Sequence, residues 1–147
     1  MAFSLIKNPW EGDLVEQLPI SSITVVNGDL LMLDKGATTW VLATSSLECW
    51  QQKAVAQAAA STAATVVLAT RVQPGQIWKA TTCTNNSSTA DNGDRMAIGA
   101  GAGIVNNSHS DVDTVVVGFI QRGIVGAAAD KVIVGEIIYG SGATQVN

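Results

Sequence analysis

The chain has 147 residues, with 12 acidic and 8 basic side chains that leave a formal net charge of −4. Charged residues make up 14% of it, against about 25% in an average soluble domain, and lysines and arginines do not cluster, so nucleic-acid binding through phosphate neutralisation is excluded. One histidine and two cysteines (Cys49 and Cys83) are too few for a zinc finger or a multi-histidine site, and we expect neither a metal nor another cofactor.

The composition favours an all-β fold. The chain has 17 valines, 11 isoleucines, 13 threonines and 14 glycines, which are residues typical of strands and turns. The length suits one domain, or one domain with an arm. A soluble monomer usually covers itself with lysine and glutamate, so their scarcity indicates surface hidden against other subunits; serine, threonine and asparagine are the alternative way to keep a surface wet.

Residues 1–22 differ from the rest of the chain. Pro9 and Pro19 each remove a backbone donor and restrict the preceding residue, so neither a long helix nor a central strand fits. The segment is nevertheless apolar, through Phe3, Leu5, Ile6, Trp10, Leu14, Val15 and Leu18. Two interpretations stay open: an extended arm that orders against a partner, or an edge strand packed on its own domain.

A β pattern begins at residue 23. Two apolar runs in 23–33 flank Asn27-Gly28, a pair that accepts the positive φ angles of a tight hairpin turn. Residues 38–44 form a further expected strand, which follows a turn at Gly36.

The middle of the chain is ambiguous and then β again. Residues 47–64 are rich in alanine, which favours helix, but they lack an apolar stripe with a 3.6-residue period. We expect a short helix or an irregular crossing there. Strands are expected at 65–72 and 76–84, separated by a turn at Pro74-Gly75.

The C-terminal part alternates polar loops with apolar strands. The loops are expected at 84–94, which ends in an Asn92-Gly93 turn, and at 106–113; the strands are expected at 95–105, 114–126 and 131–140. Glycines inside the last two strands (Gly118, Gly123 and Gly135) indicate bulges or tight corners. The whole pattern gives eight or so short strands in residues 23–147, as a small β-barrel or sandwich with an extended N-terminal arm and at most one short helix.

Sequences that resemble catalytic or metal motifs have simpler explanations. The glycines of 99–103 lack the following helix that a phosphate-binding loop needs. Ser108, His109, Ser110 and Asp111 supply the residue types of a triad, but sequence neighbours rarely reach triad geometry. The acidic turns at 91–94 and 111–113 lack the EF-hand pattern. We therefore assign no catalytic and no metal-binding residues, and expect that the protein is not an enzyme.

The four tryptophans divide by their surroundings. Trp40 and Trp78 lie in expected strands and are assigned to the core. Trp10 lies in the N-terminal segment and Trp50 in the ambiguous region, so these two are candidates for contacts with a partner or a sugar ring.

The start of the chain has no basic region followed by an apolar one, so we do not expect a secretory signal. Residues 54–70 are too polar and too short for a membrane span. Cys49 and Cys83 have no companion pattern, which favours two free thiols in a reducing compartment over a disulfide.

A family likeness is visible in residues 65–140. It rests on Pro74-Gly75-Gln76-Ile77-Trp78, on Asn92-Gly93-Asp94-Arg95, and on a closing segment from Val125 to Gly135 that contains Asp130. This part resembles the capsid decoration (cement) proteins of tailed bacteriophages, in which a "PG-x-[FIW]" turn, an "NG-x-R/K" loop and a terminal strand recur in a β-tulip-like barrel. Only the structural turns Pro74, Gly75, Asn92 and Gly93 are carried over.

The resemblance implies a homotrimer, made in the cytoplasm of a host bacterium, that binds the outer surface of a phage head and joins neighbouring major capsid proteins. Its partners would be other copies of itself and the major capsid protein, with neither nucleic acid nor membrane involved. The residues expected to contact the capsid are Phe3, Leu5, Ile6, Trp10 and Leu14 of the arm. A virion spike, or a carbohydrate- or receptor-binding module that uses Trp50 and the polar loops, is the alternative function.

Overall fold

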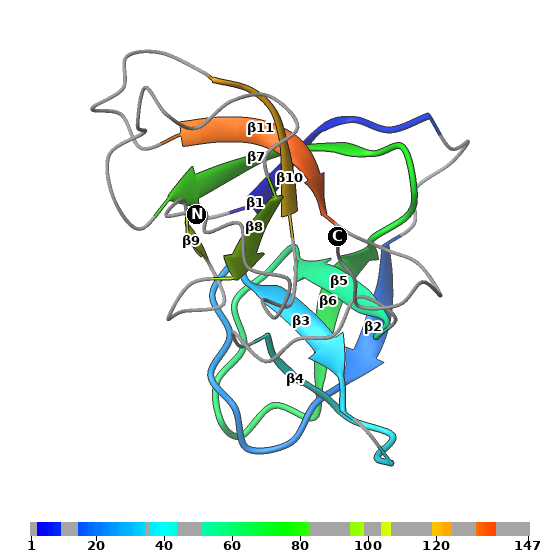
Figure 1. Ribbon diagram of the computed structural model, residues 1–147. Helices are drawn as coiled ribbons and strands as arrows, with labels where there is room; N and C mark the ends of the chain where they lie inside the picture. The colour runs from blue at the N-terminus through cyan, green and yellow to red at the C-terminus, as the bar shows by residue number, and fades with distance from the viewer. Residues whose placement is uncertain are drawn as a thin grey trace.

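The structure of the protein is a computed structural model that describes residues 3–9, 15–34, 36–43, 51–82, 95–98, 104–106, 119–124 and 132–137. These residues contain eleven strands and no helix, which confirms the all-β prediction. The strands form two sheets, one above the other in Figure 1, in place of a single closed barrel.

The five-stranded sheet comes from one continuous stretch of the chain. Its spatial order is β2 (Val15–Pro19), β6 (Val66–Arg71), β5 (Lys53–Ala56), β3 (Leu30–Leu33) and β4 (Trp40–Leu42). All four neighbouring pairs are antiparallel. Ile20, just after β2, forms an isolated bridge to Trp40 at the start of β4. Because its two outermost strands approach each other in this way, the sheet is strongly curled.

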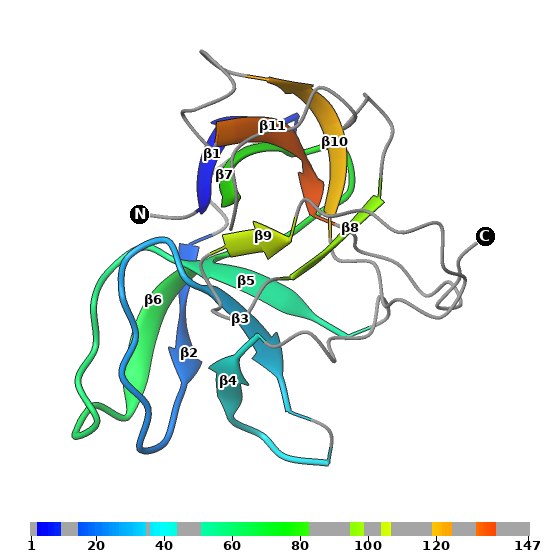
Figure 2. The same cartoon turned by 60° about the vertical axis from the view of Figure 1, so that its left-hand side comes forward.

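The six-stranded sheet takes its strands from the C-terminal half, apart from β1. Its order is β1 (Phe3–Lys7), β7 (Ile77–Thr82), β11 (Val132–Ile137), β10 (Phe119–Ile124), β8 (Arg95–Ile98) and β9 (Ile104–Asn106). The last strand, β9, also pairs in parallel with the end of β7, through Thr81↔Ile104 and Thr82↔Val105. This sheet is therefore curled as well, as the view in Figure 2 shows.

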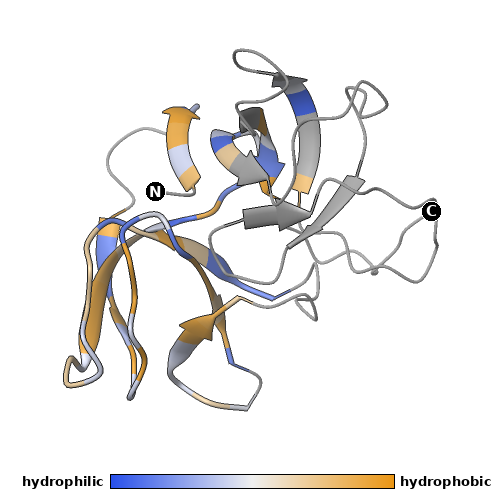
Figure 3. Ribbon diagram, turned by 90° about the vertical axis from the view of Figure 1, so that its left-hand side faces the viewer, coloured by the Kyte–Doolittle hydropathy of each residue, from blue (hydrophilic) through white to orange (hydrophobic). Residues whose placement is uncertain are grey.

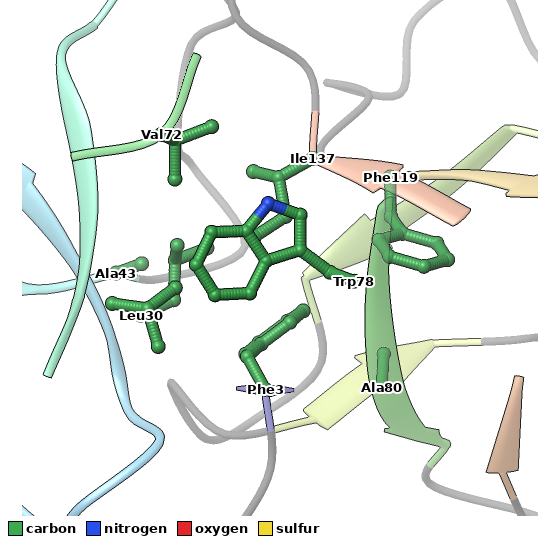
Figure 4. Packing of buried hydrophobic residues seen from close by; sticks show 9 residues of the cluster. Phe3, Leu30, Ala43, Val72, Trp78, Ala80, Phe119 and Ile137 are labelled. Atoms are coloured by element: carbon green, nitrogen blue, oxygen red, sulfur yellow. The ribbon is translucent and has the colours of Figure 1, made fainter. Parts of the chain in front are cut away.

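The described residues form two hydrophobic clusters. The first, called the intersheet core, takes residues from both sheets: Phe3, Leu30, Ala43, Val55, Val72, Trp78, Ala80, Phe119 and Ile137. The second lies inside the curl of the five-stranded sheet: Leu18, Ile20, Val25, Leu31, Trp40, Ala54, Ala56, Val67 and Ala69. In Figure 4 the indole ring of Trp78 lies at the centre of the intersheet core, between Phe3 and Val72. Trp40 and Trp78 are both buried, as predicted.

For residues 47–64 we expected a short helix or an irregular crossing; the described part, 51–64, contains no helix and is irregular apart from the strand at 53–56 and a bridge at Ala60. Residues Lys53–Ala56 form β5, a central strand of the five-stranded sheet in which all four residues are buried. Ala54 and Ala56 point into the tightly curled side of that sheet, where small side chains fit. Helix propensity is a weak preference that burial on both faces of a sheet overrides. Residues 44–50 lie outside the described part.

The Asn27-Gly28 turn is present, but it does not join a hairpin. Gly28 has a φ of 95°, and Asp29 N donates to Val26 O. Val25, before the turn, bridges Ala60, whereas β3 after it pairs with β4 and β5, so the two apolar runs do not pair with each other.

Of the other predicted turns and strands, some are confirmed and one is divided in two. The Pro74-Gly75 turn is confirmed, with a φ of 84° at Gly75. The strand expected at 95–105 is in fact two strands, β8 and β9, which pair with each other. A bulge is confirmed next to Gly123, where the register shifts between Gln121 and Gly123.

Candidate interaction surface

The N-terminal segment contributes one strand to each sheet. In β1, Phe3 lies opposite Ala80 of β7, is 1% exposed, and its N–H donates to Gly28 O at 3.0 Å. Leu5 is partly buried and packs on the intersheet core, whereas Ile6 is 55% exposed. Of the two interpretations for residues 1–22, the described parts follow the edge strand.

This placement changes what the predicted arm residues can do. Phe3 cannot fill a pocket on another protein while β1 stays paired with β7, because its ring is enclosed in the intersheet core of its own chain. Ile6 is the exposed apolar residue of β1. Trp10 and Leu14 lie outside the described residues.

The outer edge of β2 is poorly suited to accept another strand. Ile20 N donates to Thr65 O, and the register with β6 then places the free backbone groups of Val15, Gln17 and Pro19 on the side away from β6. Along β2 itself that side carries no described strand pairing, and just beyond its end Ile20 forms an isolated bridge to Trp40 of β4. Pro19 has no N–H to offer there, and prolines on an edge strand are a common protection against strand addition. A partner that docks here therefore needs the face of the sheet rather than its edge.

An uncharged apolar surface lies on that face. Val15, Gln17 and Pro19 of β2 are directly opposite Thr70, Leu68 and Val66 of β6, so these side chains share one side of the sheet. We call Val15, Gln17, Pro19, Val66 and Leu68 the β2–β6 face. The exposed fractions are 45% for Val15, 45% for Val66 and 44% for Leu68. Figure 3 shows the apolar character of the five-stranded sheet.

The exposure of this face has a simple geometric cause. Thr70 is 5% exposed, and Val55, directly opposite it on β5, belongs to the intersheet core. The six-stranded sheet thus covers one part of this side of the five-stranded sheet and stops before Leu68. The alternation in β6, with exposed Val66 and Leu68 around buried Val67, then leaves two large apolar side chains in solvent.

The charged side chains of β2 and of the end of β6 lie on the opposite side of the sheet from the β2–β6 face. The Arg71 guanidinium donates to Glu16 and to Gln52, and its central carbon lies 4.9 Å from the centroid of the Trp40 ring. Side chains of neighbouring strand residues alternate between faces, so Glu16 points away from Val15 and Gln17. Because Arg71 and Glu16 lie on the other side of the sheet and pair with each other, neither places a charge on the β2–β6 face.

A second polar cluster fixes the start of the chain to the Pro74-Gly75 turn. Gln76 is buried; its amide oxygen accepts from Gln73 N at 2.7 Å, and its Nε2 donates to Arg71 O at 3.3 Å and to Asn8 Oδ1 at 3.5 Å. The sequence indicates the turn but gives no sign that Gln76 and Asn8 meet. Because Gln76 and Asn8 are far apart along the chain, no local sequence pattern predicts this contact.

Several predicted features lie outside the described residues. These are Cys49, Trp50, Cys83, Asn92, Gly93, Gly118, the glycine-rich 99–103 segment and the Ser108–Asp111 segment. In the ranges that the structure does describe, no three His, Cys, Asp or Glu side chains are grouped to hold a metal ion. Those ranges also contain no helix with the length and apolar character to cross a membrane.

Comparison with known proteins gives no match among family models, curated proteins or solved structures.

The β2–β6 face was not predicted from the sequence. Its signal was present in residues 65–72, where valine and leucine alternate with valine and alanine. Alternation alone does not say which of two apolar sides is covered, because both are apolar here. The position of the six-stranded sheet determines which part of each side is covered.

Proposed function

We propose that this protein is a non-catalytic capsid decoration protein, which binds the outside of a tailed-bacteriophage head and stabilises contacts between major capsid proteins. The observation that carries the proposal is the β2–β6 face, an uncharged apolar surface on a packed two-sheet scaffold. The sequence likeness around the Pro74-Gly75 turn supports the same function.

The size of the face favours a repeating partner. Full burial of a valine or leucine side chain contributes about 1.5–3 kcal/mol, so the exposed halves of Val15, Val66 and Leu68 contribute roughly 3 kcal/mol together. Association costs at least about 4 kcal/mol in lost translational and rotational freedom. One such contact is therefore weak. A homotrimer that presents three copies to a regular shell gains the missing affinity through multivalency.

Binding to undecorated heads of the phage that encodes the chain tests this proposal. We expect the Val66→Ser/Leu68→Ser double variant to keep its fold, because both side chains point to solvent, and to lose about 2 kcal/mol, or roughly 30-fold, per contact. The matched control is Val26→Ser, which changes a 57% exposed valine outside β2 and β6.

Co-sedimentation with heads, followed by electron microscopy of the particles, provides the measurement. Decoration by the control and by the unchanged chain, but not by the double variant, supports the proposal. Equal decoration by all three rules out the β2–β6 face as the docking surface, and absence of decoration by the unchanged chain rules out the function. Glycan binding that is lost in Trp50→Ala would favour the receptor-binding alternative.

A further inference from the structure

The first strand is out of sequence order in the fold. Residues 15–71 build the five-stranded sheet and residues 77–137 build the rest of the six-stranded sheet. β1 alone leaves the N-terminal half and lies at the edge of the other sheet, beside β7 (Figure 1). It is thus a terminal strand that is held by residues distant in sequence.

The contacts that hold β1 are specific. Phe3 enters the intersheet core, where its ring centroid lies 6.3 Å from that of Phe119. At the other end, Pro9 lies against the turn, so closely that a Cβ on Gly75 would come within 3.3 Å of Pro9 Cγ. Asn8 accepts from the buried Gln76. The site beside β7 therefore fits this chain's own residues 3–9.

We propose that β1 is exchangeable between copies: where two copies lie side by side, β1 of one copy pairs with β7 of the other. The occupant is a second copy because the site beside β7 is complementary to Phe3, Asn8 and Pro9 of this sequence. Five residues, 10–14, separate Pro9 from Val15 and include Gly12. Pro9 and Val15 are therefore six Cα–Cα steps apart and can be separated by at most about 22 Å, so exchange requires closely apposed neighbours.

The protein concentration decides whether β1 pairs with β7 of its own chain or with β7 of a second copy. The same contacts form within one chain or between two, so the exchange changes few interactions. A short tether gives the internal partner an effective concentration of the order of millimolar. A dilute chain therefore keeps its own strand, and exchange competes only where copies are held together. In a decorated shell this would link neighbouring subunits, and in that respect the inference rests on the proposed function.

Disulfide trapping tests the exchange on the purified full-length chain. Ser4 and Lys79 are directly opposite in the β1–β7 pair. Isotope-labelled Ser4→Cys chain is mixed with unlabelled Lys79→Cys chain at about 10 µM and about 1 mM in a glutathione buffer, concentrations below and near the effective value. Mass spectrometry of tryptic peptides then identifies disulfides that join a labelled to an unlabelled copy at the two introduced positions.

The expected result is such mixed disulfides at about 1 mM, at least roughly tenfold above a control that pairs Val26→Cys with Lys79→Cys, and few at low concentration. A chain that carries both Ser4→Cys and Lys79→Cys must form the internal disulfide when dilute; failure to do so contradicts the register on which the inference rests. If the internal disulfide forms but mixed disulfides stay at the control level at the higher concentration, β1 does not exchange. No phage head is present, so this result is independent of whether the chain decorates heads.

Discussion

Replacement of Phe3 by alanine distinguishes a strand packed on its own domain from a free arm. Phe3 is 1% exposed, and its ring is tilted by 53° against that of Phe119 in the intersheet core. Removal of a buried phenylalanine side chain typically costs about 3–5 kcal/mol, because the surrounding residues relax only partly into the cavity. β1 is terminal, however, and can detach without global unfolding, so its docking free energy sets the upper limit. We expect a loss of about 3 kcal/mol.

Urea denaturation followed by tryptophan fluorescence measures this loss, since Trp78 lies in the same cluster. With a slope of about 2 kcal/mol per molar, the transition midpoint of Phe3→Ala should fall by roughly 1.5 M. The control is Ile6→Ala, on the same strand but 55% exposed, for which we expect less than about 1 kcal/mol. If both variants shift the midpoint equally little, Phe3 does not support the core, and the residues of β1 are available to a partner after all.

Two glycines give further predictions about backbone and packing. A Cβ at Gly123 would lie 3.0 Å from Val134 Cγ2, so Gly123→Ala should lower the free energy of unfolding by about 1–2 kcal/mol, and Val134→Ala in the same chain should recover part of it. Gly75→Ala meets both a φ of 84° and the contact with Pro9, and should cost about 1–2 kcal/mol. Gly36→Ala is the control: Gly36 has a φ of 72°, and a Cβ there would meet no atom within 4 Å, so its loss of stability measures the backbone strain alone. Thermal unfolding measures the free energy of unfolding of each variant. If Val134→Ala recovers none of the stability lost in Gly123→Ala, the contact with Val134 is not the cause of that loss. If Gly75→Ala and Gly36→Ala lose the same stability, the contact with Pro9 contributes nothing.

Local patterns predicted those features that depend on one stretch of chain. The strand expected at 65–72 corresponds to β6, and the Pro74-Gly75 pair marked the turn after it. Within the ambiguous segment 47–64, the strand at 53–56 was not predicted, because alanine has a high helix propensity in isolation. Ala54 and Ala56 are small enough to fit inside the curled five-stranded sheet, and the space available there is set by strands elsewhere in the chain.

For residues 1–22, the sequence predicted the apolar character but not the surface on which these residues pack. The sequence indicated that residues 1–22 have apolar side chains and need a partner surface. It could not say whether that surface belongs to another protein or to the same chain. In the structure, Phe3 of β1 lies opposite Ala80 of the same chain.

The amino-acid sequence by itself determined the β character, the turns at Gly36 and Pro74-Gly75, and the burial of Trp40 and Trp78, since these follow from local backbone and side-chain preferences. Only the tertiary structure decided which sheet each strand joins, that β1 crosses to β7, and that Val66 and Leu68 face solvent. Those choices depend on contacts between residues far apart in sequence. Their free energy arises from surface buried jointly by both partners, and no single segment encodes it.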